Sequence, residues 1–396
     1  MCVFYSRPAA LAPATAGKPM RLCFVALTIA LLAGLVPLGR ADLPSCLTNS
    51  EYLLRGWGTV DGLPEDSATA IVQSQDGYLW FGTFKGLVRY NGDQFTVLNP
   101  DNTPELPSAG IVNLHLDKRD RLWVSTYQGL VLREGPQWRP LRQPDGSPLG
   151  MVRTFSERAN GDVLVTTFDG KVYESSGADL AELPSPPGAQ GQGYLGGVDD
   201  EGHWWVLQHQ FVGRWETNRW VRMLPPLDVP DEALGCAPAR DGGLWLLLGK
   251  DLRKVRRGAV VARVALPESP GSVWSLCEDS QGNVWIASFN QGFSRIAPGG
   301  DMRRWRIADG LSDQGRCVFE DRERNLWLGT SGDGLLRLTH RRFQHFQLTS
   351  TSKGVLVHSV SADGTGGVWA ATFGKGLFHL NEAGETTLPP PALSNS

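Results

Sequence analysis

The feature that most constrains this chain is a tryptophan that returns every 40 to 43 residues. Aligning the chain on this residue gives eight copies of one unit, and only the third copy carries leucine at the anchor position. The anchors are Trp80, Trp123, Leu164, Trp205, Trp245, Trp285, Trp327 and Trp369. A fixed period of this length indicates a repeat architecture, so the 396 residues do not by themselves predict several separate domains.

Other positions of the unit repeat in register with the anchor. Gly stands three places before it in six copies, Asp stands six places before it in five copies, and Thr or Ser follows three places after it in six copies. The aspartates are Asp117, Asp199, Asp279, Asp321 and Asp363. Asp and Gly at these places are typical of tight turns, because Asp bonds neighbouring backbone groups and Gly accepts positive φ.

Short apolar runs lie between these turns. In the second copy, Ile111–Leu116 is a predicted first strand and the segment around Trp123 a second; in the first copy, Leu87–Tyr90 is a third and Gln94–Val97 a fourth. Four strands per repeat are typical of a β-propeller, whose blades bury each other's faces by circling an axis. The predicted fold class is therefore all-β, a β-propeller of four-stranded blades.

The number of blades in the ring stays open at this point. The segment from Trp57 to Leu63 matches the segment from Trp305 to Leu311, which precedes the seventh anchor. The amino-terminal segment is therefore an outer strand without its own blade, and it can close a ring by joining the last blade. The ring could close after the seventh anchor, which leaves residues 346–396 as a surplus eighth repeat, or after the eighth anchor as a closed eight-bladed ring, and both arrangements pair the edge strands.

The first 41 residues are predicted to be a targeting segment. Arg7, Lys18 and Arg21 precede the uncharged, mostly apolar stretch Leu22–Leu38, and small residues follow before Asp42. This pattern predicts export, either with a cleaved signal peptide or with an uncleaved membrane anchor. Among the cysteines outside this segment, Cys236, Cys277 and Cys317 fall on equivalent strands and are predicted to be buried small side chains.

The repeated pattern D-x-x-G-x-L-W-x-x-T-x-x-G-L, with W-x-x-x-D-G-L-P between copies, resembles the two-component regulator propeller family. The clearest copies run from Asp61 to Tyr90 and from Asp309 to Leu338, and the resemblance spans about 51–380. It implies a periplasmic sensor, or one on the outer face of the cytoplasmic membrane, whose relatives add a second propeller, a membrane helix and a kinase or cyclase output. By that analogy we expect residues 49–345 to be a seven-bladed first propeller and 346–396 to be the start of an incomplete second one, with a closing eighth blade as the alternative. This sequence stops at Ser396 without kinase or cyclase motifs, so we expect a truncated receptor or a stand-alone binding module.

The candidate ligand site lies where the innermost strands begin, eleven places before each anchor. A residue that departs from the repeat at this position points to a function rather than to shared packing. The candidates for binding a ligand are therefore Arg153, Tyr194, Trp274, Arg316 and His358. A second series, four places after each anchor, includes Phe84, Tyr127 and Phe168 and has two interpretations: packing between blades, or part of the same mouth. Flat rings beside guanidinium groups suit an oligosaccharide or another small molecule.

The remaining function classes have weaker support. A formal charge of −3 with both signs interspersed gives no reason to expect nucleic acid as a partner. No nucleophile, zinc-protease or phosphate-loop pattern occurs, so we expect no catalytic residues, no metal and no cofactor, and no enzyme activity. A protein-interaction propeller is the alternative function, a propeller lyase or hydrolase is a weaker one, and a second copy or membrane receptor components are possible partners.

Overall fold

The structure is a computed structural model that describes residues 52–177, 179–187, 195–208, 211–223, 233–305, 311–341, 356–364, 367–373, 376–380 and 386–387. The predicted targeting segment and Cys46 lie outside these ranges. Within them, no helix has the length and apolar character that crossing a bilayer requires.

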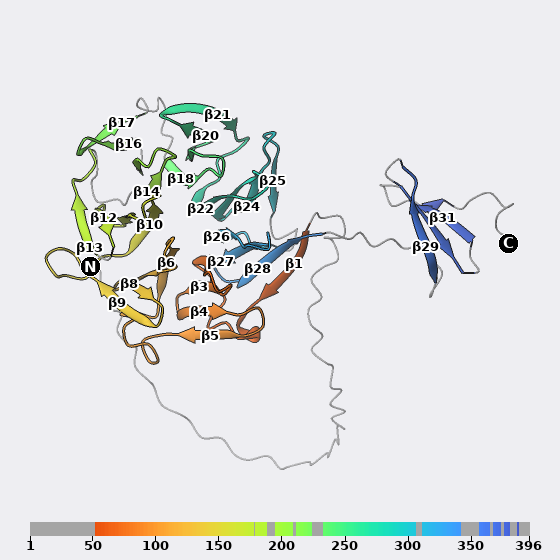
Figure 1. Ribbon diagram of the computed structural model, residues 1–396, viewed down its shortest axis with the longest axis horizontal. Helices are drawn as coiled ribbons and strands as arrows, with labels where there is room; N and C mark the ends of the chain where they lie inside the picture. The colour runs from red at the N-terminus through yellow and green to blue at the C-terminus, as the bar shows by residue number, and fades with distance from the viewer. Residues whose placement is uncertain are drawn as a thin grey trace, which may run out of the picture. The chain divides into compact units, whose positions relative to one another are not determined.

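The described chain forms eight four-stranded antiparallel sheets and a single 3₁₀ turn, η2 (Thr59–Asp61) (Figure 1). Seven of the sheets are blades of a propeller, and six of these run in chain order from an inner to an outer strand. The first three blades are β2 (Ala70–Gln73), β3 (Leu79–Thr83), β4 (Gly86–Tyr90), β5 (Phe95–Leu98); β6 (Ile111–Leu116), β7 (Leu122–Thr126), β8 (Gly129–Glu134), β9 (Gln137–Leu141); and β10 (Val152–Glu157), β11 (Val163–Thr167), β12 (Val172–Ser176), β13 (Asp179–Leu183). The next three are β14 (Leu195–Val198), β15 (Trp204–Gln208), β16 (Phe211–Glu216), β17 (Arg219–Arg222); β18 (Ala233–Pro238), β19 (Leu244–Leu248), β20 (Asp251–Arg256), β21 (Ala259–Ala265); and β22 (Ser272–Glu278), β23 (Val284–Phe289), β24 (Gly292–Ile296), β25 (Met302–Trp305).

The seventh blade joins the two ends of the ring. It consists of β26 (Gly315–Glu320), β27 (Leu326–Thr330) and β28 (Leu335–His340), and its outer strand is the amino-terminal β1 (Tyr52–Trp57), which pairs antiparallel with β28. Each inner strand contacts the inner strand of the next blade, and β26 contacts β2 of the first blade. The ring therefore closes after the seventh repeat, as predicted, and the eight-bladed alternative is not what the chain adopts.

The eighth repeat forms a sheet of its own. Its strands are β29 (Val357–Ala362), β30 (Val368–Thr372), β31 (Gly376–Leu380) and β32 (Thr386–Thr387), and among the described strands they pair only with one another. The surplus repeat thus has the same unit structure without being a blade of the seven-bladed ring.

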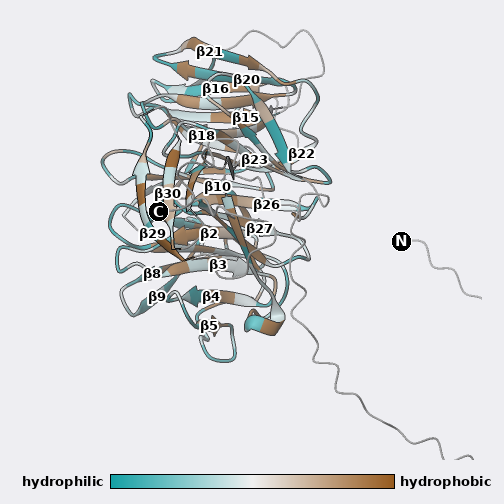
Figure 2. Cartoon of the chain, turned by 90° about the vertical axis from the view of Figure 1, so that its right-hand side faces the viewer, coloured by the Kyte–Doolittle hydropathy of each residue, from teal (hydrophilic) through white to brown (hydrophobic). Residues whose placement is uncertain are grey.

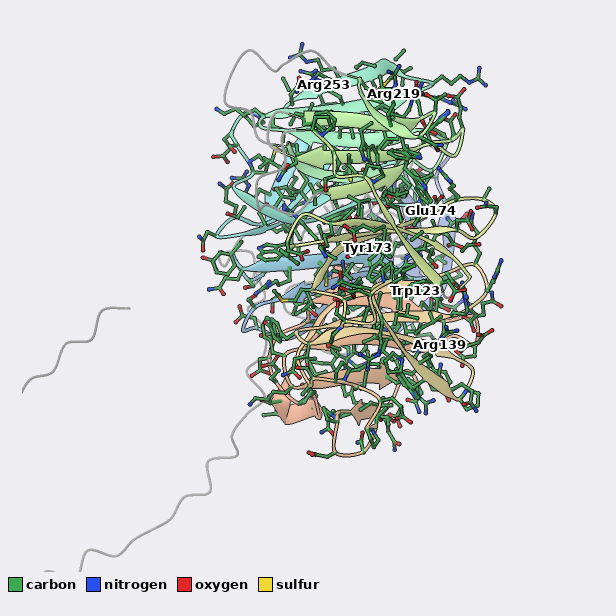
Figure 3. All side chains as sticks on the ribbon, turned by 90° about the vertical axis from the view of Figure 1, so that its left-hand side faces the viewer. Trp123, Arg139, Tyr173, Glu174, Arg219 and Arg253 are labelled. Carbon is green, nitrogen blue, oxygen red and sulfur yellow. The ribbon has the colours of Figure 1, made fainter. Side chains whose placement is uncertain are left out.

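The second strand of each blade carries the core. Strands β3, β7, β11, β15, β19 and β27 are buried at every residue, because each lies within its sheet and is covered by a neighbouring blade on both faces. Strands covered on both faces have continuous apolar runs rather than alternating patterns. Hydrophobic segments accordingly fall mainly on strands, and the connecting loops are mainly hydrophilic (Figure 2). Trp123 on β7 is fully buried, whereas Arg139 lies on the outer strand β9 with an exposed side chain (Figure 3).

The repeated aspartate and tryptophan are partners in one hydrogen bond. In four blades the indole Nε1 donates to the carboxylate six places earlier, at 2.7 to 2.9 Å; the pairs are Trp123–Asp117, Trp205–Asp199, Trp285–Asp279 and Trp327–Asp321. The other carboxylate oxygen accepts backbone N–H groups two and four places after the aspartate, as Asp279 does from Gln281 and Asn283. The sequence pattern is therefore the signature of a buried carboxylate that organises the turn and holds the core indole.

The other repeated positions also have local causes. The Thr126 hydroxyl donates a hydrogen bond to the carbonyl of Gly129 at 2.9 Å and so stabilises the turn between the second and third strands. The Thr330 hydroxyl donates in the same way to the carbonyl of Gly334 at 2.8 Å. The glycine three places before the anchor has positive φ, as at Gly77 and Gly282 (91° and 80°), a conformation that favours glycine.

Of the three described cysteines, Cys317 is buried as predicted, whereas Cys236 and Cys277 are half-buried. Cys236, Cys277 and Cys317 lie on the inner strands β18, β22 and β26 as free thiols. Burial raises the pKa of each to about 12, so they are protonated, unreactive side chains of the inner ring.

Candidate ligand-binding site

A cavity of about 330 Å³ lies where inner strands from several blades begin, and we call it the axial cavity. Its walls come from the starts of β2, β6, β10, β22 and β26, together with Phe168 and Leu195. Three of the predicted site residues, Arg153, Trp274 and Arg316, line it. Among its described lining residues none is acidic, so its polar surface comes from guanidinium, hydroxyl, amide and backbone groups.

A second cavity of about 260 Å³ continues along the same inner strands. The two cavities share Asn113, Arg153, Thr154, Trp274 and Ser275, among other residues. The second cavity extends further along the strands, to His115 on β6 and to residues of β18.

A β-bulge explains why these side chains reach the axis. The pairing of the first and second strands shifts register around Arg153, around Trp274 and around Arg316, so each of these residues is the extra residue of a bulge. The same shift occurs at Val112 and Leu234. A bulge turns its extra residue out of the regular ladder of hydrogen bonds. The residue eleven places before the anchor is therefore directed away from the sheet packing in each of these five blades.

The Arg316 guanidinium lies between two aromatic rings. It is 4.4 Å from the ring centroid of Trp274 in the preceding blade and 5.3 Å from that of Phe84 in the first blade. Its Nε donates to Ser331 Oγ at 2.5 Å, which leaves the two terminal nitrogens of the fork for other acceptors. Burial lowers the pKa of Arg316, because the charged guanidinium has fewer water molecules around it. A ligand oxygen that accepts hydrogen bonds from the guanidinium would replace that water and stabilise the charge.

The ring of Phe84 continues this contact into the second blade. It stacks on Tyr127 with centroids 6.1 Å apart and an interplanar angle of 18°. Trp274, Arg316, Phe84 and Tyr127 thus form a continuous row across four successive blades, which we call the aromatic row. Trp274 is 49% exposed and Tyr127 is 51% exposed, so both ends of the row offer ring surface to a ligand.

The second arginine contacts a ring in the same manner. The Arg153 guanidinium is 5.8 Å from the centroid of Phe168, and burial lowers its pKa. The backbone of Arg153 is held by the neighbouring blade, because Asn113 Nδ2 donates to its carbonyl at 2.9 Å.

The structure brings three of the five predicted residues together. Arg153, Trp274 and Arg316 share one cavity, and Tyr194 lies outside the described residues. His358 is the bulge residue of β29 in the eighth sheet, and it does not line the axial cavity. Phe84 belongs to the series four places after each anchor, for which we considered packing between blades or a place at the site. Its ring packs on Tyr127 of the next blade and also contacts the Arg316 guanidinium.

Sequence reasoning missed polar residues that lie one place further along three of the inner strands. Asn113, Thr154 and Ser275 line the axial cavity and also bond between blades; Ser275 Oγ, for example, accepts from Val318 N at 3.3 Å. No clear signal marked them, because the strands of Thr154 and Ser275 carry other polar residues as well.

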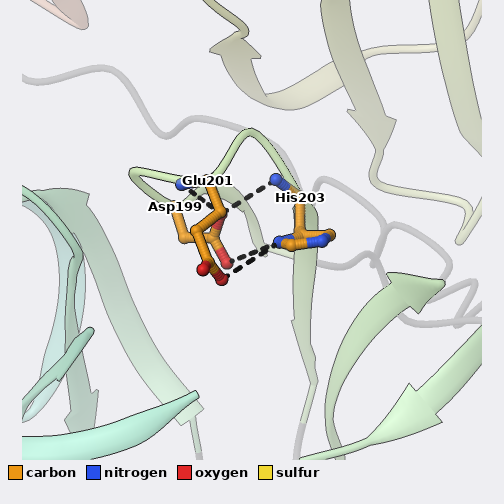
Figure 4. Close-up of side chains that lie close together, drawn as sticks. All are labelled: Asp199, Glu201 and His203. Atoms are coloured by element: carbon orange, nitrogen blue, oxygen red, sulfur yellow. Dashed lines mark hydrogen bonds and ion pairs between the residues drawn. The ribbon is translucent and has the colours of Figure 1, made fainter. Parts of the chain in front are cut away.

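One group of side chains has a spacing that metal sites also show. Asp199, Glu201 and His203 have ligand atoms within 4.8 Å of one another (Figure 4). The Asp199 carboxylate, however, already accepts from the Trp205 indole and from two backbone N–H groups, and Arg214 Nη1 lies 3.9 Å from it. Since its lone pairs are used and a guanidinium supplies the positive charge, this turn is a variant of the repeated Asp–Trp turn.

His115 is the histidine that faces the axial region. Its Nε2 lies 3.8 Å from Glu157 Oε2, and burial lowers its pKa to about 4. A neutral imidazole with so low a pKa is a weak proton acceptor at neutral pH, so the pair does not resemble a general base poised for catalysis.

Comparison with known proteins supports the resemblance predicted from the repeats. The family model for the two component regulator propeller matches residues 62–85 and 267–290. These segments contain the first and sixth anchors, so the predicted resemblance is confirmed at the level of the repeat. A search of curated proteins gives no match.

Solved structures share the fold at low sequence identity. The extracellular domain of a protein described as a hybrid two component system from B. thetaiotaomicron has a TM-score of 0.62 at 18% identity, over 87% of this chain and 50% of that one. The extracellular domain described as a one component system from the same organism gives 0.58 at 16%, over 84% and 46%. This chain therefore spans about half the length of these extracellular domains.

Virginiamycin B lyase from Staphylococcus aureus is also similar. It has a TM-score of 0.60 at 15% identity, over 73% of this chain and 99% of the lyase. At such identities the likeness shows the propeller fold alone, which hosts both sensors and enzymes.

Proposed function

We propose that this chain is the ligand-sensing propeller of an exported signalling receptor and that its axial cavity binds an oligosaccharide. The observation that carries the proposal is the convergence of Arg153, Trp274 and Arg316 on one cavity from three different blades. The match to the two component regulator propeller model supports the signalling context. The proposal includes residues 1–41 as the export segment and residues 49–345 as the sensing domain.

The chemistry of the cavity suits a sugar. The C–H faces of a pyranose stack on exposed rings such as Trp274 and Tyr127, and its hydroxyl oxygens accept hydrogen bonds from the Arg316 fork. Side-chain amide and hydroxyl groups from Asn113 and Ser275 add further polar positions on the cavity wall. A cavity that is mostly apolar with a few convergent donors is the usual form of a small-molecule site.

The test is binding of the purified chain to an array of neutral and acidic oligosaccharides. The double variant Arg316→Ala/Trp274→Ala should fold normally and lose the glycans that the wild type retains. Arg139→Ala is the matched control, because this arginine lies exposed on an outer strand and should leave binding unchanged. A folded double variant with wild-type binding would refute the assignment of the site.

Two other outcomes separate the alternative functions. Release of shortened or unsaturated products during incubation would identify a catalytic propeller. Capture of a protein partner that glycans do not displace, and that the double variant still captures, would favour an interaction platform at another surface.

A further inference from the structure

The fifth blade breaks the Asp–Trp rule in a way that no other blade does. Its anchor is Trp245, but the residue six places earlier is Ala239. The first blade substitutes serine there, and Trp80 Nε1 donates to Ser74 Oγ at 3.1 Å instead. The third blade has lost the indole itself, because Leu164 is its anchor.

Trp245 is consequently left with a donor and no acceptor. The side chain is 8% exposed, and its Nε1 is buried without a hydrogen-bond partner among the described residues. By position, the backbone N–H groups of Asp241 and Gly243 are the two further donors that an aspartate would have bonded. A buried unsatisfied donor costs about 1–3 kcal/mol, so the site favours an occupant that accepts hydrogen bonds.

The number and kind of donors select the occupant. In the second, fourth and sixth blades the same three donors converge on the two oxygens of one carboxylate, as around Asp279. A water molecule offers fewer acceptor positions and brings two hydrogens of its own, whereas a carboxylate has only acceptors. The Ala239 methyl group already supplies the Cβ of the missing aspartate, so the absent atoms are those of a carboxylate group.

A groove gives access to this position. A hollow of about 740 Å³ between the fifth and sixth blades is lined by Asp241 and Trp245, which contribute two of the three donors. Lys254 also lines it, with a side chain only 10% exposed and its Nζ 5.2 Å from the Trp245 ring centroid. Its ion-pair partner Asp241 is 68% exposed, so within the described part of the chain this buried ammonium is paired with a carboxylate that lies largely in solvent.

The acidic groups of the groove are already engaged. Asp279 accepts from Trp285 and Asn283, and Glu278 accepts from the backbone of Arg240. The cations Arg240, Lys254 and Arg256 line the same groove, each in an ion pair of its own, with Glu320, Asp241 and Asp200 respectively. An entering anion therefore competes with carboxylates for these cations, and the indole N–H, unpartnered among the described residues, is the donor that the groove leaves open.

We propose that this groove is a second ligand site, which binds the carboxylate of a small organic acid in the place of the missing aspartate. The site is independent of the axial cavity and of the ligand proposed there. Formate is the simplest probe, because it is the carboxylate that alanine lacks relative to aspartate; acetate tests whether the groove accommodates a substituent.

The experiment follows the Trp245 indole N–H resonance in the ¹⁵N-labelled chain, assigned as the signal lost in Trp245→Phe. Sodium formate should shift this resonance saturably, and sodium chloride at equal ionic strength should not. In Ala239→Asp the protein's own carboxylate fills the position, so the formate affinity should fall by about tenfold or more and the melting temperature should rise.

Two further variants keep the outcome decisive. Ala239→Ser copies the first blade and should weaken the formate response if the aspartate variant does not fold. Arg316→Ala should leave the response unchanged, which separates this site from the axial cavity. An indole resonance that ignores formate in the wild type, or that shifts equally in the wild type and in Ala239→Ser, would overturn the proposal.

Discussion

The Arg316 guanidinium lies 4.4 Å from the ring centroid of Trp274, although the two residues belong to neighbouring blades and are 42 positions apart. Both are the extra residue of a β-bulge in their own sheet. Two independent local irregularities therefore meet at the axis to make one feature, a guanidinium plane held against an indole at the mouth of the cavity.

Replacing Arg316 with lysine should weaken ligand binding while keeping the charge. Lysine cannot present a planar fork between the rings of Trp274 and Phe84, and stacked cation–π contacts contribute about 0.5–2 kcal/mol. We expect Arg316→Lys to reduce the affinity for the best oligosaccharide of the array by about tenfold in calorimetric titration. The control Arg139→Lys should bind as the wild type does; equal affinity of both variants would mean that the row does not hold the ligand.

Gly110 sets the position of the Tyr127 ring. A Cβ atom on Gly110 would lie 2.2 Å from Tyr127 Cδ2, so Gly110→Ala must displace the ring from its stack on Phe84. Because Tyr127 is half exposed, it can swing into solvent at little cost in stability. We expect unchanged thermal stability and a roughly two- to tenfold loss of oligosaccharide affinity, in line with the contribution of an aromatic contact.

Gly150→Ala is the matched control for that substitution. Gly150 precedes the inner strand of the next blade, and its added Cβ would meet Asp169 at an ordinary 3.7 Å. It should leave affinity unchanged. If Gly110→Ala also binds normally, Tyr127 is a packing residue only.

The strand that closes the ring should contribute strongly to stability. Trp57 at the end of β1 is 6% exposed and stacks on Trp327 of the same blade, with centroids 5.2 Å apart. Truncating a buried tryptophan costs about 3–5 kcal/mol, so Trp57→Ala should lower the urea midpoint clearly. Leu53→Ala on the same strand is 52% exposed in the wild type and should change stability by less than about 0.5 kcal/mol. Similar midpoints for the two variants would show that β1 does not close the ring in solution.

His115 should make the propeller less stable in acid. Burial lowers its folded-state pKa to about 4 from an ordinary value of 6.5, so the unfolded chain binds the proton more readily. Its contribution is complete above pH 6.5 and declines as the pH falls towards 4, by up to about 3 kcal/mol. Urea unfolding of the wild type and of His115→Phe between pH 7.5 and about 4 measures the difference.

The neighbouring Glu157 acts in the opposite direction. Burial is the largest cause that raises its pKa, so its contribution favours the folded state at low pH. The difference between wild type and His115→Phe isolates the histidine, provided that both variants retain Glu157. Parallel pH profiles for the two proteins would contradict the assignment of a buried, neutral His115.

Local sequence was sufficient for the unit of this fold. The anchor tryptophan, the turn glycine and the aspartate six places before Trp123 or Trp285 act within one blade, over contacts of a few residues. Such contacts leave a periodic trace, so strand positions such as Ile111–Leu116 followed directly from the pattern. The repeat also suggested where inner strands begin, and hence Arg153, Trp274 and Arg316.

Tertiary structure decided how the repeats meet. The repeat marked the amino-terminal segment as an outer strand, but it allowed closure after seven or after eight units. The pairing of β1 with β28, a contact between segments nearly 300 positions apart, decided between them. The same holds for the aromatic row, whose members come from blades that touch only once the ring is assembled. The unpartnered indole of Trp245 differs, because its cause, Ala239 in place of aspartate, lies in the same blade and can be read from the sequence. The sequence by itself determined the blade, because its interactions are local and repeated; only the closed ring determined which deviations from the repeat share a cavity, because long-range packing brings them to one axis.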